Sequence, residues 1–62
     1  MKINELLNHV YPSCKVILYY ENGEELEYMA GDLTYPLPGN KDLADSNFSD
    51  WAMYTHYLAI FM

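Results

Sequence analysis

The chain has 62 residues, of which 52% are hydrophobic and seven are tyrosines, and its formal net charge at pH 7 is −6. It contains three lysines and no arginine. So few cations cannot neutralise a phosphate backbone, and we expect no direct binding to DNA, RNA or an anionic membrane. The same acidity favours a partner with a basic surface, because opposite potentials steer association.

The length predicts one domain, residues 1–62, that buries only about 60% of its unfolded surface. Cys14 is the single cysteine, so we interpret it as a small buried apolar residue in a reducing compartment; the alternative is a reactive or intermolecular thiol. Residues 1–11 carry Glu5 and Asn8 where a signal peptide needs an apolar run, and no stretch approaches the ~20 apolar residues of a membrane span. We therefore expect a soluble, cytoplasmic protein.

An amphipathic helix is predicted from Ile3 to Tyr11, because apolar residues recur there at helical spacing. Asn4 is the better candidate for the N-cap, and Pro12 with Ser13 ends the helix. We expect the apolar side of this helix to pack on a sheet.

A β-hairpin is predicted next. Lys15 to Tyr20 is β-branched and aromatic, and Glu24 to Ala30 forms the returning strand. Between them, Asn22-Gly23 is the strongest short-range hairpin signal, because a type I′ turn needs positive φ at both positions.

A two-residue loop fixes the register of this hairpin, with Glu21 opposite Glu24 and Leu18 opposite Glu27. Alternation then predicts a core face under the helix that carries Ile17, Tyr19, Leu26 and Tyr28. The other face is mixed and carries Val16, Leu18, Tyr20, Glu25, Glu27 and Met29. One helix covers only one face, so a second subunit is the simplest cover for the other, and we expect a homodimer.

The middle of the chain is predicted to be irregular. Gly31-Asp32 is expected to form a turn, and Thr34 to Asn40 an extended connection, because this stretch contains two prolines and a glycine. Lys41 to Asn47 is expected to form one short helical turn.

Two strands are predicted at the C-terminus, Ser49 to Met53 and Tyr57 to Met62, joined by a turn near Tyr54 to His56. The last strand is uncharged and apolar on both sides, so it must be central in the sheet or paired with another chain to avoid aggregation. The expected fold class is α+β: a short N-terminal helix followed by two β-hairpins that form a small antiparallel sheet.

No motif for catalysis or metal binding is present. Cys14 with His9 or His56 has no sequence context typical of a nucleophile and base, and the two histidines lack ligand spacing. The three glycines stand singly in turns rather than in a phosphate-binding loop. We expect no enzymatic activity, no metal and no cofactor.

The acidic hairpin has two interpretations. In the first, its charges serve only solubility, because a charged edge strand resists edge-to-edge pairing. Alternatively, carboxylates interleaved with Tyr19, Tyr20 and Tyr28 place negative charge beside flat rings, as a DNA surface does. Trp51 is either core or, if exposed, an interface anchor. The candidate partner-binding residues are Glu21, Glu24, Glu25, Glu27, Tyr20, Asp32 and Trp51.

The order of a helix (INELLNHV), a hairpin (KVILYYENGEELEYMAGDL), an irregular middle and a terminal segment (DWAMYTHYLAIFM) resembles small accessory proteins of phages and prophages of low-GC Gram-positive bacteria. The hairpin is similar to that of phage uracil-DNA glycosylase inhibitors, acidic dimeric DNA mimics. Val16 to Tyr20, Glu21-Asn22-Gly23 and Glu24 to Met29 occupy the strand, the acidic glycine turn and the tyrosine-rich strand. The chain departs from them in its first helix, in Pro36 and Pro38 where the inhibitors have a helix, and in its two terminal strands.

In size, acidity and lack of catalytic motifs the chain also resembles anti-CRISPR proteins. These resemblances imply a non-enzymatic inhibitor, in the cytoplasm of a bacterial host, that occupies a basic nucleic-acid-binding surface of a nucleic-acid-handling or defence protein. The alternative is a small self-assembling structural or interaction module whose acidic surface only provides solubility.

Overall fold

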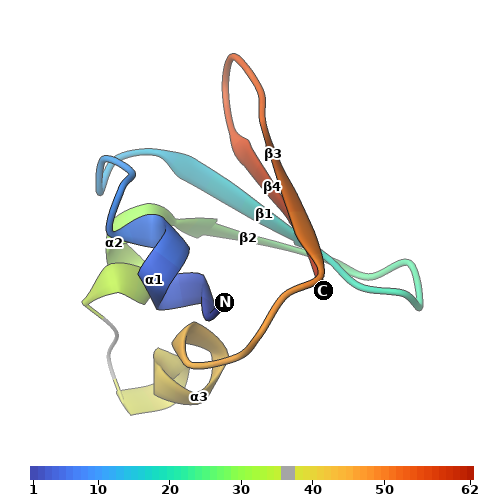
Figure 1. Ribbon diagram of the computed structural model, residues 1–62, viewed down its shortest axis with the longest axis horizontal. Helices are drawn as coiled ribbons and strands as arrows, with labels where there is room; N and C mark the ends of the chain where they lie inside the picture. Colours follow the sequence, from blue (N-terminus) through green and yellow to red (C-terminus); the bar gives the residue numbers. More distant parts are fainter. Residues whose placement is uncertain (36–37) are drawn as a thin grey trace.

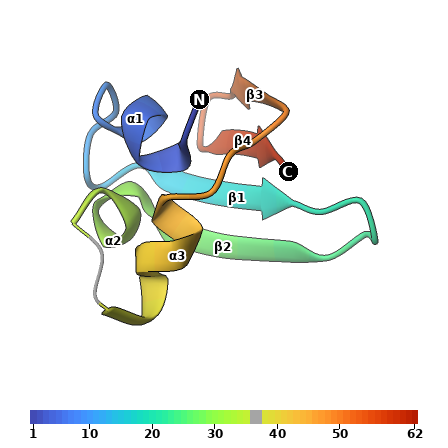
Figure 2. The same ribbon diagram turned by 60° about the horizontal axis from the view of Figure 1, so that its bottom comes forward.

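The computed structural model describes residues 1–35 and 38–62. The protein is α+β, as predicted, with its helices gathered on one side of a twisted four-stranded sheet (Figures 1 and 2). The elements are α1 (Ile3–Leu7), β1 (Lys15–Tyr19), β2 (Glu25–Met29), α2 (Ala30–Thr34), the 3-10 helix η1 (Pro38–Asn40), α3 (Lys41–Ala44), β3 (Asp50–Met53) and β4 (Leu58–Phe61).

The sheet is mixed rather than antiparallel, and the predicted antiparallel sheet is therefore wrong. The strand order is β2-β1-β4-β3. Both predicted hairpins form, but β1 pairs with β4 in parallel. A parallel pair needs a long crossover connection, and here the chain between β1 and β4 supplies it. The pairing makes the two most apolar strands central, which confirms the expectation that β4 is not an exposed edge.

The turn between β1 and β2 has three residues, not two. Tyr20 still pairs with Glu24, so the loop consists of Glu21, Asn22 and Gly23. Gly23 has φ of 89°, and its N–H donates to the carbonyl of Tyr20 at 3.0 Å. The N–H of Tyr20 in turn donates to the carbonyl of Glu24 at 2.9 Å. Asn22 keeps an ordinary negative φ and its side-chain oxygen accepts from the N–H of Glu24 at 2.9 Å, which is typical of an Asx-type turn. A type I′ turn, with positive φ at Asn22, therefore does not form.

This extra loop residue shifts the register by one position and exchanges the faces of β1. Leu18 pairs with Leu26 rather than Glu27, and Leu18 is fully buried together with Val16. Ile17 and Tyr19 are half-buried and lie on the opposite face. The predicted core face was thus wrong for β1, although it was correct for Leu26 and Tyr28, which pack against the core.

The core fills the space between the sheet and the helices. It combines the inward sides of β1 and β4 with apolar residues from all three α-helices. Its members are Ile3, Leu6, Leu7, Val16, Leu18, Ala30, Leu33, Ala44, Leu58 and Ile60.

Helix α1 ends four residues earlier than predicted, because the backbone hydrogen bonds that follow it span three residues rather than four. Its N-cap is Lys2, whose N–H donates to Oε1 of Glu5 at 3.0 Å. Asn4, the predicted cap, instead donates its amide to Oδ1 of Asp45 at 2.9 Å and so connects the first helix to the segment after α3.

The predicted turn at Gly31-Asp32 is also wrong, because both residues lie in α2. The N–H of Gly31 donates to the carbonyl of Pro12 at 2.9 Å, and a Cβ at this position would come within 3.1 Å of the Pro12 ring. α2 therefore packs directly on the segment after α1. α3 is the short helical turn predicted near Lys41, and part of the predicted irregular connection, residues 36–37, lies outside the described residues.

The register makes a prediction that distinguishes the two faces of β1. Leu18→Ala empties a fully buried position and should lower the free energy of unfolding by about 2–5 kcal/mol, most of what such a small core contributes. Ile17→Ala, on the half-buried face, should have a clearly smaller effect. Urea denaturation followed by circular dichroism measures both. The reverse order would show that the register is the one with the two-residue loop.

Candidate functional site

The four hairpin glutamates are all exposed, but they lie beside different tyrosines. Burial, followed by the proximity of Tyr28 and Glu24, raises the pKa of Tyr20 above its ordinary value of 10.0. Tyr57 is the largest cause of the raised pKa of Tyr19, followed by burial, and the Glu25 carboxylate adds a smaller contribution. The hairpin therefore offers carboxylates on both of its faces rather than one acidic side.

Tyr20 does not serve as the exposed aromatic contact that the sequence suggested. Its side chain packs against the core on the helix-covered side of the sheet. Glu25 and Glu27 pair with Tyr19 and Ile17 and so belong to the other face. The prediction that Tyr20 shares a face with Glu25 and Glu27 is wrong, because it depended on the two-residue loop.

The second face of the sheet carries no helix from residues 1–35 or 38–62. All the helices of the described residues lie on the opposite side (Figure 2). The uncovered face presents Ile17 and Tyr19 from β1, Ala59 and Phe61 from β4, and Ala52 from β3. Ala59 is only 1% exposed, although no helix lies above it, so neighbouring side chains of the same face cover it.

Four aromatic side chains form a connected row on this face. The rings of Tyr19 and Phe61 stack with their centroids 5.4 Å apart, and those of Tyr54 and Tyr57 stack at 5.1 Å. The Tyr57 hydroxyl is the largest cause of the raised pKa of Tyr19, so the two pairs are neighbours on this face. We refer to Tyr19, Tyr54, Tyr57 and Phe61 as the aromatic row. Alternation along residues 57–61 places Tyr57 and Phe61 on one face, and the observed register of β1 adds Tyr19 to them.

Two rows of cross-strand partners run across this face, and the first ends in a carboxylate at both edges whereas the second does so only at the β2 edge. In the first, Tyr19 pairs with Glu25 on one side and with Phe61 on the other, and Phe61 pairs with Asp50. In the second, Ile17 lies between Glu27 and Ala59, and Ala59 pairs with Ala52. The centre of the face is therefore apolar and aromatic, with Glu25 and Glu27 at its β2 edge and Asp50 at its β3 edge.

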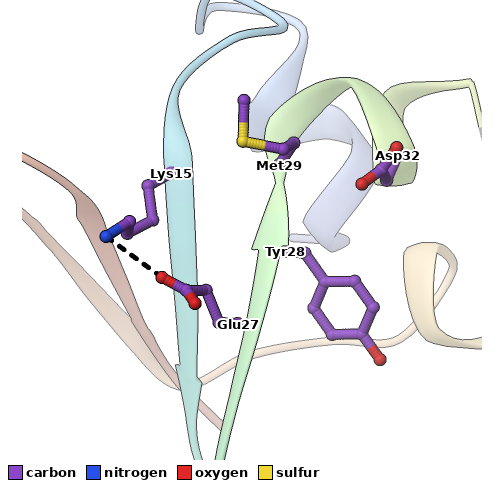
Figure 3. A pocket seen from close by; sticks show the side chains of 5 residues that line it. All are labelled: Lys15, Glu27, Tyr28, Met29 and Asp32. Atoms are coloured by element: carbon purple, nitrogen blue, oxygen red, sulfur yellow. Dashed lines mark ion pairs between the residues drawn. The ribbon is translucent and has the colours of Figure 1, made fainter.

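A shallow hollow of about 430 Å³ lies beside β2, lined by Lys15, Glu27, Tyr28, Met29 and Asp32 (Figure 3). Nζ of Lys15 is 3.1 Å from Oε1 of Glu27, and both side chains are at least half exposed, so this pair contributes about 0–1 kcal/mol to stability. Asp32 lies at the opposite end of β2 from the turn at Gly23 and does not extend the acidic tip.

Trp51 is exposed, which answers one question that the sequence left open. Its exposed fraction is 47%. It lies on the edge strand β3, where it pairs with Ile60 of β4. Two strands, β4 and β1, separate it from β2. Trp51 is therefore not part of one continuous surface with the hairpin glutamates.

Cys14 is half-buried and packs against the core, although it is not fully buried as the sequence suggested. Within residues 1–35 and 38–62, no group of three or more His, Cys, Asp or Glu side chains is arranged to hold a metal ion. None of the helices in the same part of the chain is long and apolar enough to cross a membrane.

Comparison of the chain with protein-family models, with characterised proteins and with solved structures finds no match.

The aromatic row makes a prediction about pH. The neighbouring Tyr57 hydroxyl, followed by burial, raises the pKa of Tyr19 to about 12. The unfolded chain ionises Tyr19 near 10, so the stability linked to this residue is complete below pH 10 and is lost as the pH rises through about 12. Tyr57→Phe should move the pKa of Tyr19 down toward 10, measured as tyrosinate absorbance, whereas Tyr35→Phe should leave it unchanged. If the pKa of Tyr19 is the same in Tyr57→Phe as in the wild-type protein, the two aromatic pairs are not connected.

Proposed function

We propose that the protein is a non-enzymatic inhibitor that binds a basic, nucleic-acid-binding surface of a host protein through its acidic hairpin. The observation that carries this proposal is the uncompensated charge of the hairpin. Among the described residues the one ion pair joins Lys15 to Glu27. Glu21, Glu24 and Glu25 are exposed, and the other two lysines lie at the N-terminal ends of α1 and α3.

Uncompensated charge favours such a partner for two physical reasons. A field of one sign accelerates encounter with a surface of the other sign and disfavours acidic surfaces. Exposed charges are also screened within about 8 Å at physiological ionic strength, so the attraction should weaken with salt.

The arrangement of acids and rings supports an inhibitor of the DNA-mimic or anti-CRISPR type, encoded by a phage or prophage and acting in the bacterial cytoplasm. Glu25 lies directly across from Tyr19, whose ring stacks on Phe61. Negative charge beside stacked rings is what a nucleic-acid-binding surface accepts from phosphate and bases. In this proposal Tyr19 takes the role that the sequence assigned to Tyr20.

A second candidate function is a small self-assembling module whose glutamates only provide solubility. The uncovered aromatic row favours it, because such a face could be buried against a second copy to form a homodimer. This candidate predicts an oligomer that tolerates salt, whereas the inhibitor predicts a complex that salt weakens.

The test is capture from a Gram-positive lysate by tagged protein at low and at moderate salt, with identification by mass spectrometry. We expect a basic DNA- or RNA-handling protein at low salt and its loss at moderate salt. Adding the untagged protein should then displace nucleic acid from the purified partner, because both occupy one surface.

A pair of variants distinguishes the effect of the hairpin charges on partner binding from the effect of the overall net charge. Glu24→Gln with Glu25→Gln removes two charges from the hairpin, and Asp42→Asn with Asp45→Asn removes two from the α3 segment. Asparagine at position 45 retains an oxygen for the hydrogen bond from Asn4. The hairpin variant should lose the partner and the control should keep it. Equal capture by both variants would refute the proposal.

A further inference from the structure

We infer that the uncovered face of the sheet is the docking surface for a basic amphipathic helix of the partner. This inference rests on the proposed function and specifies which part of the partner is bound. The helix would place an apolar side over Ile17, Tyr19 and Phe61, with lysines or arginines on its flanks.

The centre of the face has the composition of an interface core. Tyr19 and Tyr57 are half-buried, Phe61 is 38% exposed and Tyr54 is 51% exposed, so ring surface remains accessible. Stacking holds these rings before any partner arrives. Large aromatic side chains that are already ordered lose little conformational freedom on binding, which favours affinity.

The edges of the face carry the opposite charge to that of a basic helix. Glu25 borders the centre on β2 and Asp50 borders it on β3, both without an ion pair among the described residues, while Glu27 on β2 pairs with Lys15. Three strand spacings separate Glu25 from Asp50, a span of about 14 Å. A helix with its side chains is roughly 10–12 Å across, so it fits between these borders with cationic side chains reaching both.

A second copy of this chain does not supply that chemistry. A two-fold symmetric dimer through this face would oppose identical surfaces, so the acidic borders would meet acidic borders. Among the described residues, Lys15 is the one cation on the face and already pairs with Glu27, and Lys2 and Lys41 belong to helical segments on the other side of the sheet. Charge complementarity therefore selects a basic partner over self-association.

The binding mode is one in which a helix lays its apolar side on a complementary apolar surface. Helices already cover the first face of this sheet, and helices on both faces are a common layer architecture. A partner helix would complete the same arrangement on the second face.

The experiment uses a labelled synthetic peptide in which leucines recur at helical spacing and lysines fill the flanks. A scrambled peptide of identical composition has the same charge but no apolar side. We expect the wild-type protein to bind the amphipathic peptide roughly tenfold more tightly than the scrambled one, measured by fluorescence anisotropy.

Two further measurements locate the peptide. In amide NMR spectra of the wild-type protein, resonances of β1 and β4 around Tyr19 and Phe61 should shift on titration, which requires no mutation. Tyr19→Ser should weaken binding by roughly tenfold or more, the effect of losing an interface aromatic. Tyr11→Ser changes a tyrosine that is 84% exposed and lies outside the aromatic row, so it should leave the affinity unchanged.

Four results would overturn the inference, and they differ in what they say about the proposed function. Equal affinity for both peptides, or shifts confined to residues 21–24, refutes the helix site while leaving the charged hairpin intact. Failure of both peptides to bind, together with equal capture by the hairpin and control variants, refutes the inference and the proposed function together. A wild-type dimer in sedimentation equilibrium that Phe61→Lys converts to monomer shows that a second copy covers the face.

Discussion

The three-residue turn between β1 and β2 is the constraint on which the rest of the structure depends. Gly23 adopts the left-handed conformation that ends this turn, and the carbonyl of Tyr20 is satisfied by its N–H. That one residue of loop length decides which side chains of β1 are buried. It places Val16 and Leu18 under the helices and leaves Tyr19 on the uncovered face.

The parallel pairing of β1 with β4 builds on this register. Val16 and Leu18 lie beside Leu58 and Ile60 on the inner face, and all four are fully buried. On the other face the same pairing brings Tyr19 beside Phe61. A single register thus produces a conventional core on one side and a surface of stacked rings between carboxylates on the other.

The separation of faces explains how a chain of net charge −6 combines a stable core with a charged binding surface. Exposed carboxylates at the turn and along β2 avoid the desolvation that burial would impose on them. Their mutual repulsion opposes folding, and an oppositely charged partner would relieve it. We therefore place the proposed function on the uncovered face and the hairpin, and the stability of the fold on the helix-covered face.

The sequence predicted the positions of the helices and strands better than the register and order in which the strands pair. Apolar periodicity located α1, and the runs Lys15 to Tyr20 and Tyr57 to Met62 located the central strands. The Asn22-Gly23 signal located the turn but not its length, because Asn22 tolerates both ordinary and left-handed backbone conformations. The parallel contact between β1 and β4 depends on a crossover that no local pattern encodes, so the sheet order could not be predicted.

The candidate site was partly predictable for the same reason. The acidic character of the hairpin follows from composition alone, and the exposure of Glu21, Glu24, Glu25 and Glu27 agrees with it. The assignment of faces failed because a slip of one residue exchanges every side chain of a strand. The aromatic row joins residues from β1, β4 and the turn before β4, and only the sheet order brings these together.

The measurement that tests the central claim most directly is hydroxyl-radical footprinting of the side chains with and without the captured basic partner. Our account predicts that Tyr19, Tyr54 and Phe61 lose reactivity in the complex, while Tyr11 and Tyr35, which are exposed elsewhere on the molecule, keep theirs. Protection of Tyr11 or Tyr35 with an unchanged aromatic row would contradict the account and place the partner on another surface.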